Sequence, residues 1–234
     1  MLQPYLYPEL IVRSLVLEEE PIAIMAGDDN PWMEGLVLTT TVGFLAGIAQ
    51  TIGRWLTAAS LPDPVTISTT LTDGWRQFAT VTNLPATAVE QGINRIWSAY
   101  AVLQGYFSGW TQAVPVLATP FILIVWWLFF AIVAFAAART MGGKGSLNST
   151  LGAVALIVAP QVLTFLSFIP FVAVSGALLA VWGALIGYRA VQVAHDLSWQ
   201  RAAFVTLIPY AGALLLLPLL GTAFALGFTA GGFR

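Results

Sequence analysis

The feature that most constrains this chain is the uninterrupted apolar run FILIVWWLFFAIVAFAAA at residues 121–138. An α-helix needs about 20 mostly apolar residues to cross the hydrocarbon layer of a membrane, and the preceding residues extend this run to a predicted span over 114–138. Only 9% of the residues are charged, against about one quarter in soluble domains. The chain is therefore predicted to be a polytopic membrane protein.

Five stretches are apolar enough to span a membrane, and they predict an all-α integral membrane fold, a five-span helical bundle. The predicted spans are residues 35–53, 114–138, 147–168, 170–188 and 203–227. Pro160, Pro209 and Pro218 fall inside the third and fifth of them. Proline lacks a backbone donor and clashes with the preceding turn, so kinks are expected at these residues. The freed carbonyls then need partners on neighbouring helices, which favours a packed bundle.

Two segments lie outside the predicted spans. Residues 1–34 form an acidic tail in which Arg13 is the one basic residue, and a solvated tail is preferred over a calcium site because no EF-hand pattern is present. In the long loop 54–113, the stretch LPDPVTISTT at residues 61–70 is expected to be extended. The stretch from Ala88 to Trp110 is amphipathic and predicts a helix in the membrane interface or against the bundle.

Basic residues in the short loops predict the orientation of the chain. In a five-span chain the N-terminus shares one side of the membrane with the loops 139–146 and 189–202. These loops carry Arg139, Lys144, Arg189 and Arg201. This side is predicted to be cytoplasmic, and the long loop and the C-terminus are expected on the opposite side.

The loop after the second predicted span reads GGKGS, residues 142–146, and resembles a phosphate-binding loop at first sight. A P-loop needs a hydroxyl residue directly after Gly-Lys and a further glycine earlier, but Gly145 and Ala138 occupy these positions. We predict a tight helical hairpin instead, with Lys144 as a topology anchor or a lipid-headgroup contact. The following Asn148-Ser149-Thr150 matches a glycosylation acceptor, but a helix cap by the Asn or Ser is preferred.

His195 is the only histidine. One imidazole can serve as the axial ligand of a haem or a chlorophyll, whereas zinc needs three or four ligands and the chain has no second His and no Cys. The alternative is an interfacial residue at the end of the fourth span, hydrogen-bonded near Asp196. We prefer this alternative because functional ionisable residues normally lie deeper in a span.

Glycine pairs at GxxxG spacing indicate where helices approach each other closely. Two such pairs are predicted to be packing faces: Gly43 with Gly47, and Gly183 with Gly187.

No catalytic constellation is visible in the sequence. The spans contain no pair of carboxylates and no G-x-S-x-G elbow, so an enzyme is not expected. Gln50, Gln161 and Thr164 are too sparse for a proton relay, which argues against an ion-coupled transporter.

Residues 138–209 resemble the Yip domain family of Ypt/Rab-interacting membrane proteins, in particular its prokaryotic branch. The resemblance is carried by the Gly-Gly-Lys-Gly loop after the second span, Ala-Pro at 159–160, Ile-Pro at 169–170, a tryptophan in the fourth span, and His-x-Leu-Ser followed by Arg-Ala at 195–202. It implies a Yip-like membrane domain over 35–234. It also makes a special ligand role for His195 less expected, because the family pattern accommodates this position.

The eukaryotic members are similar to trafficking factors that recruit prenylated small GTPases and shape early secretory membranes. For prokaryotic relatives the resemblance implies a scaffold without a settled activity. We therefore predict a non-enzymatic membrane scaffold or adaptor in a bacterial cytoplasmic membrane. The alternatives are an accessory structural subunit of a photosynthetic or respiratory complex, and a small-solute transporter or channel.

The expected partners are membrane lipids and either other integral membrane subunits or a second copy of the chain. A formal net charge of −2 gives no general attraction to nucleic acid. No cofactor is required apart from bound lipid, and a pigment is expected only within a larger complex.

Overall fold

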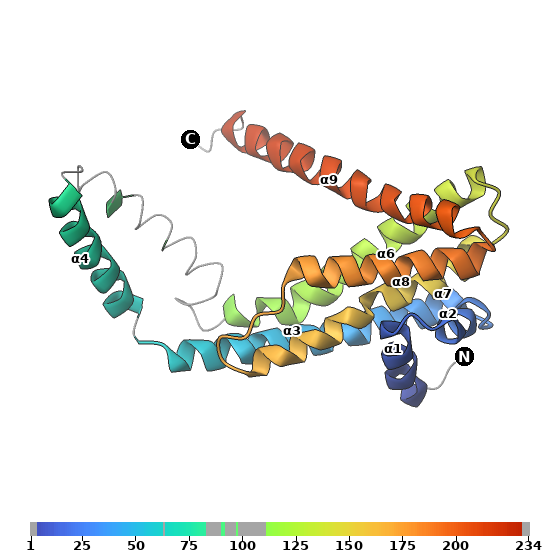
Figure 1. The fold of residues 1–234 in the computed structure, drawn as a ribbon, viewed down its shortest axis with the longest axis horizontal. Helices are drawn as coiled ribbons and strands as arrows, with labels where there is room; N and C mark the ends of the chain where they lie inside the picture. Colours follow the sequence, from blue (N-terminus) through green and yellow to red (C-terminus); the bar gives the residue numbers. More distant parts are fainter. Residues whose placement is uncertain (1–3, 63, 83–89, 92–96, 98–110, 231–234) are drawn as a thin grey trace. The chain divides into compact units, whose positions relative to one another are not determined.

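The computed structural model describes residues 4–62, 64–82, 90, 91, 97 and 111–230. These residues form helices joined by short connections, and no strand occurs among them (Figure 1). Among them are the 3₁₀ helices η1 (Pro4–Leu6), η2 (Thr111–Ala113) and η3 (Ala155–Phe168), and the α-helices α1 (Tyr7–Leu15), α2 (Glu19–Ala26), α3 (Pro31–Ser60), α4 (Pro64–Thr82), α6 (Val114–Thr140), α7 (Leu147–Val154), α8 (Gly176–His195) and α9 (Trp199–Ala230). The all-α class predicted from the sequence is thus confirmed.

Four helical segments of the described chain are long and apolar enough to cross a membrane: α3, α6, α7 together with η3, and α8. On α6, the side chains of Leu117, Phe121 and Ile122 are each more than 60% exposed, an arrangement that suits contact with lipid tails rather than water. The fifth predicted span, 203–227, falls on α9. The count of five spans and the three proline kinks stay predictions.

The residues divide into two compact units. The first unit comprises Met1–Gly43, Pro120–Gln161 and Ser175–Arg234, and the second comprises Phe44–Thr119 and Val162–Val174. In the first unit α2 packs against α7 and α8, and α8 packs against α9. Its core consists of large side chains that are almost fully buried, among them Ile22, Met25, Trp127, Phe130, Leu156 and Ile186.

The third predicted span changes from an α-helix to a 3₁₀ helix at Ala155. The backbone N–H of Ala155 donates to Gly152 O, so the carbonyl of Leu151 has no donor in the normal α-helical pattern. The indole Nε1–H of the buried Trp127 donates to this carbonyl at 2.9 Å. Trp127 therefore supplies from α6 the hydrogen bond that the change of helix type removes.

Pro160 lies inside the 3₁₀ segment and cannot donate to the carbonyl of Ile157, three residues earlier. This carbonyl faces Gly183 of α8, where a Cβ atom would lie 3.1 Å from the oxygen. Four residues on, a Cβ atom at Gly187 would lie 2.9 Å from Phe130 Cζ. The glycine pair Gly183/Gly187 thus lies where α7–η3 and α6 leave little room for a side chain on α8.

The other predicted glycine pair, Gly43 and Gly47, also lies where the backbones of neighbouring segments come close together. In the first unit, a Cβ atom at Gly43 would lie 2.5 Å from Pro120 Cα. In the second unit, a Cβ atom at Gly47 would overlap the carbonyl oxygen of Pro115, and one at Gly53 would overlap that of Ser167. Gly53 was not recognised from the sequence because it has no partner at GxxxG spacing in the predicted span.

Hydroxyl groups also connect the elements of the second unit. Thr51 Oγ1 donates to the carbonyl of Gln112 at 3.1 Å, and Ser167 Oγ lies 3.1 Å from the carbonyl of Ala49. Thr51 and Ser167 therefore satisfy backbone carbonyls at the contacts of α3.

The prediction that residues 61–70 are extended was wrong, because α4 is helical from Pro64 onward. Proline suits the first turn of a helix, where its missing N–H is not needed. The hydroxyls of Ser68, Thr70 and Thr72 each donate to a backbone carbonyl three or four residues earlier. The β-branched residues thus find hydrogen bonds within the helix that the sequence pattern did not reveal. The amphipathic stretch Ala88–Trp110 lies almost entirely outside the described residues.

The fourth predicted span, 170–188, was placed too early, since α8 runs from Gly176 to His195. Phe171 has a backbone φ of 66°, a left-handed conformation that a helix cannot contain, and the helix begins only after Ser175. At the other end α8 continues past Tyr188, and Arg189 there pairs with Glu19 of α2.

Candidate functional site

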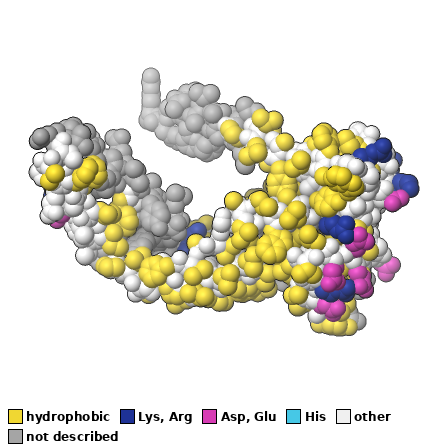
Figure 2. Space-filling view, in the orientation of Figure 1, with side chains coloured by type: hydrophobic (Ala, Val, Ile, Leu, Met, Phe, Trp, Pro, Cys, Tyr) yellow, Lys and Arg dark blue, Asp and Glu magenta, His cyan; other side chains and the backbone are white. Residues whose placement is uncertain are grey.

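The candidate site is the end of the first unit where the GGKGS loop, the end of α8, the start of α9 and the segment α1–α2 meet. We call this region the polar end, and Figure 2 shows most of the visible charged side chains gathered over it. Its ion pairs are Arg13 with Glu9, Glu18 and Glu20, Lys144 with Asp196, and Arg189 with Glu19.

The GGKGS loop begins with a Schellman turn at the end of α6. Gly142 has φ of 86°, Gly142 N–H donates to Arg139 O at 3.3 Å, and Gly143 N–H donates to Ala138 O at 2.8 Å. This pattern satisfies the last carbonyls of the helix and needs a residue that tolerates a left-handed conformation, which explains the glycine at 142. The loop connects α6 directly to α7, as the predicted hairpin requires.

The same loop packs on the end of α8. Lys144 N–H donates to His195 O at 3.1 Å, and a Cβ atom at Gly145 would overlap the carbonyl oxygen of Ala194. Asp196 ends α8 in a left-handed conformation with φ of 53°. The glycines at 143 and 145 are therefore needed because the backbone passes directly over α8, and a phosphate does not explain them.

His195 is completely buried beneath this loop. Its Nε2 lies 2.8 Å from Thr150 Oγ1, and the Thr150 hydroxyl donates its single proton to Ser146 O at 2.7 Å. Thr150 must therefore accept from His195, so the imidazole carries its proton on Nε2. His195 Nδ1 has no hydrogen-bond partner among the described residues.

This geometry leaves little room for the less preferred role of His195, that of a pigment or haem ligand. Nε2 is occupied by Thr150, and Cβ atoms at Gly143 and Gly145 would lie 2.9 and 3.0 Å from Nδ1. A macrocycle has no open ring nitrogen to bind. His195 is the last residue of α8, at the end of the span as expected, but it is buried and its hydrogen bond goes to Thr150 of α7.

The helix cap at the start of α7 is Ser146, whose hydroxyl accepts the N–H of Ser149 at 3.1 Å. The sequence had indicated a cap by Asn148 or Ser149. Asn148 Oδ1 instead accepts the N–H of Trp32 at 3.2 Å, which connects the start of α3 to α7. The cap falls two residues earlier because the helix begins as soon as the glycine loop ends.

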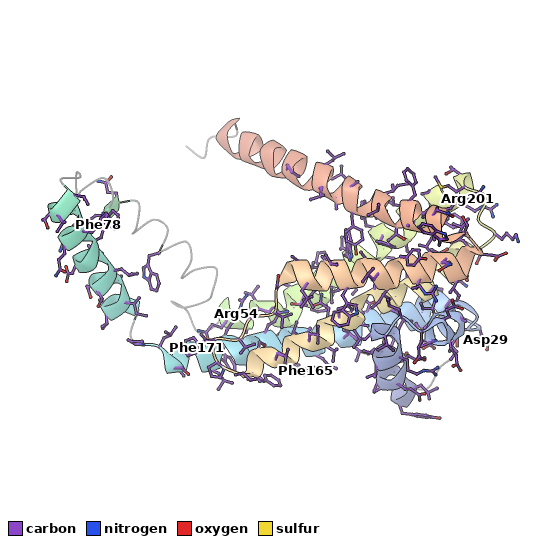
Figure 3. All side chains as sticks on the ribbon, viewed as in Figure 1. Asp29, Arg54, Phe78, Phe165, Phe171 and Arg201 are labelled. Carbon is purple, nitrogen blue, oxygen red and sulfur yellow. The ribbon has the colours of Figure 1, made fainter. Side chains whose placement is uncertain are left out.

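The four cations predicted to set topology and to contact headgroups meet at the polar end, and each has a protein partner. Arg139 and Arg201 donate to the loop carbonyls of Gly143 and Met141, at 3.3 and 3.1 Å, and Figure 3 labels Arg201 at the start of α9. Arg189 donates to Glu19 at 2.5 Å. Their roles in topology and lipid contact stay predictions.

The side chains of Lys144 and Asp196 are 78% and 77% exposed and lie 2.7 Å apart. The hydrogen bond to Asp196 raises the pKa of Lys144, and the same bond lowers the pKa of Asp196. At this exposure the pair contributes little to stability. It is an exposed ion pair on a loop whose backbone is hydrogen-bonded to the end of α8.

The acidic segment is not a solvated tail. Tyr7 and Leu10 of α1 and Ile22 and Met25 of α2 are buried in the core of the first unit. Gly152 of α7 allows this contact, since a Cβ atom there would overlap Met25 O and lie 2.5 Å from Pro31 Cβ. The apolar spacing of the two short helices was a usable sequence signal, but the acidic composition obscured it.

Polar contacts hold α1 in place. The Tyr7 hydroxyl donates to the buried carboxylate of Glu34 at 2.6 Å, and the indole of Trp182 donates to Leu15 O, the last residue of α1, at 2.9 Å. Burial raises the pKa of the Tyr7 hydroxyl, and the hydrogen bond to Glu34 raises it further. Arg13 joins the end of α1 to the start of α2 through Glu18 at 2.5 Å and through Glu20.

The described residues contain no group of three His, Asp or Glu side chains that could hold a metal ion.

A family model for the Yip1 domain matches residues 23–221, which is most of the chain. The protein therefore belongs to the Yip1 domain family of membrane proteins. This match confirms the resemblance drawn from the sequence and extends it on both sides of residues 138–209. No curated protein and no solved structure matches the chain.

Proposed function

We propose that this protein is a non-enzymatic membrane scaffold or adaptor of the prokaryotic Yip type. Five helices cross the cytoplasmic membrane, the polar end faces the cytoplasm, and partner proteins dock on it. The polar end is the surface on which α1 and α2, the GGKGS loop and the ends of α8 and α9 come together.

The observation that carries this proposal is the combination of exposed charge and a fixed backbone at the polar end. Lys144 and Asp196 are more than three-quarters exposed. Directly beneath them the Schellman turn, the Lys144 N–H bond to His195 O and the buried His195–Thr150 bond fix the backbone. A rigid surface loses little conformational freedom when a partner binds, which favours affinity.

The test is purification of the full chain in mild detergent, followed by mass spectrometry of the proteins that remain bound. Lys144→Glu reverses an exposed charge at the polar end, and Arg76→Glu on α4 is the matched reversal elsewhere. The proposal predicts that the wild-type chain and Arg76→Glu retain the same integral membrane partners and that Lys144→Glu loses them.

A wild-type chain that elutes alone as a monomer would contradict the adaptor role. Recovery of the subunits of a respiratory or photosynthetic complex would instead identify an accessory subunit. Flux of ions or small solutes through proteoliposomes of the purified chain would indicate a transporter or channel.

A further inference from the structure

Helix α4 carries a row of apolar side chains, of which Ile67 is half-buried and the others are exposed. Ile67, Leu71, Phe78 and Val81 are spaced by four, seven and three residues, which places them on one side of a helix. Leu71, Phe78 and Val81 are 46%, 48% and 82% exposed, and Figure 3 shows Phe78 on this helix. We call these four residues the α4 apolar stripe.

The opposite side of α4 is polar but almost without net charge. Thr66, Thr69, Asp73 and Thr80 lie on it at helical spacing. The only charged residues of α4 are Asp73 and Arg76. They form an ion pair at 3.1 Å, and Arg76 also pairs with Glu90. Electrostatic attraction to an anionic surface therefore contributes little to whatever this helix binds.

Most hydroxyl groups of α4 do not need water as a hydrogen-bond partner. The hydroxyls of Thr69, Thr70 and Thr72 donate to backbone carbonyls of the same helix, and Ser68, Thr80 and Thr82 do so as well. A polar group that already has a partner costs less to move out of bulk water. This composition suits the boundary between lipid headgroups and acyl chains.

The position of α4 in the chain indicates which surface covers the stripe. It follows the membrane-spanning candidate α3 after three residues, Leu61–Asp63. The four peptide steps from Ser60 to Pro64 reach at most about 14 Å. The start of α4 thus lies within about 14 Å of the end of α3, a candidate membrane span, so lipid is an apolar partner within reach of the stripe.

We propose that α4 is a lipid-binding helix that lies in the membrane interface, with the α4 apolar stripe inserted between acyl chains. Because α4 has no net charge that would attract it to headgroups, its binding depends on the apolar area that it buries. The helix therefore prefers loosely packed lipid to anionic lipid. This inference concerns the second unit and does not rest on the adaptor role of the polar end.

The chain has no cysteine, so single-cysteine variants of the full-length protein carry one fluorescent label each. Phe78→Cys places an environment-sensitive nitrobenzoxadiazole label on the stripe. Thr80→Cys, two residues away on the polar side, is the matched control. The labelled proteins are placed in nanodiscs of dioleoyl phosphatidylcholine, of dimyristoyl phosphatidylcholine, and of dioleoyl phosphatidylcholine with phosphatidylglycerol.

The proposal predicts blue-shifted emission for the label at 78 and quenching of this label by spin-labelled acyl chains, with neither effect at 80. The shift is larger in the dioleoyl than in the dimyristoyl lipid, and phosphatidylglycerol does not change it. Equal, water-like emission at both positions would overturn the proposal. A blue shift at 78 without quenching by lipid would show that protein covers the stripe, and insertion only with phosphatidylglycerol would show charge recognition; either result overturns it too.

Discussion

The polar end and helix α4 differ in where their polar groups find hydrogen-bond partners. At the polar end, side chains bond to groups on other elements, as His195 on α8 bonds to Thr150 on α7 and Trp182 on α8 bonds to Leu15 on α1. In α4, hydroxyls bond to carbonyls of the same helix, and the large apolar side chains remain exposed. The first region is therefore stabilised by its own packing, whereas the second is proposed to depend on the lipid around it.

Glycine substitutions should show this difference most strongly. Gly152→Ala places a methyl group against Met25 O and 2.5 Å from Pro31 Cβ. A backbone carbonyl and a proline ring cannot move aside as a flexible side chain can. We expect it to destabilise the packing of α2 on α7 by about 1–3 kcal/mol. Thermal unfolding in detergent and proteolysis of the α1–α2 segment would measure the loss.

Gly74→Ala in α4 is the matched control, because a Cβ atom there has no heavy atom within 4 Å. It should be neutral or stabilise by up to about 1 kcal/mol, the usual gain in helix propensity. Equal destabilisation by both substitutions would contradict the proposed difference between the regions.

The buried hydrogen bond between Thr150 and His195 should give the next largest effect. Thr150→Val leaves His195 Nε2–H buried without an acceptor, which costs about 1–3 kcal/mol. Thr150→Ser keeps a hydroxyl and should recover most of this loss. If valine and serine destabilise the protein equally in denaturant unfolding, the hydrogen bond is not the cause.

Loss of the hydrogen bond that anchors α1 should have a smaller effect than loss of the bond between Thr150 and His195. Tyr7→Phe removes the hydrogen bond to Glu34 and is expected to cost about 0.5–1.5 kcal/mol, seen as faster proteolytic cleavage of the N-terminal segment. Tyr5→Phe is the control, because the Tyr5 side chain is 71% exposed. Unchanged cleavage in Tyr7→Phe would mean that apolar burial alone holds α1 in place.

The smallest effect is expected at the exposed ion pair. The lowered pKa of Asp196 stabilises the fold above the unfolded-state pKa, and this contribution is lost as the pH falls through the folded-state pKa. The raised pKa of Lys144 stabilises the fold below the unfolded-state pKa. This contribution is lost as the pH rises through the folded-state pKa.

Lys144→Ala should therefore raise the pKa of Asp196 toward its ordinary value, measured by NMR titration of the carboxyl carbon, without a measurable change in stability at neutral pH. Lys144→Arg should keep the pKa low. A lowered melting temperature in Lys144→Ala would show that the pair matters more than its exposure suggests.

The sequence predicted what long apolar runs and local geometry determine. The run at 121–138 predicted α6, and the glycines of GGKGS predicted the turn between α6 and α7. It failed where distant residues decide the outcome. The burial of His195 depends on a loop 50 residues away, and the packing of α2 depends on Gly152. The helix at 64–82 was missed because threonine-rich sequence favours strands unless its hydroxyls bond within the helix.

The most direct test of the account is the side of the membrane on which each region lies. Single cysteines at Lys144 and Arg76 are labelled with a membrane-impermeant maleimide in intact cells and again after permeabilisation. One predicted span, α6, separates the two positions, and the polar end is proposed to be cytoplasmic. We predict that Arg76→Cys reacts in intact cells and that Lys144→Cys reacts only after permeabilisation. Labelling of both from the same side would contradict the account.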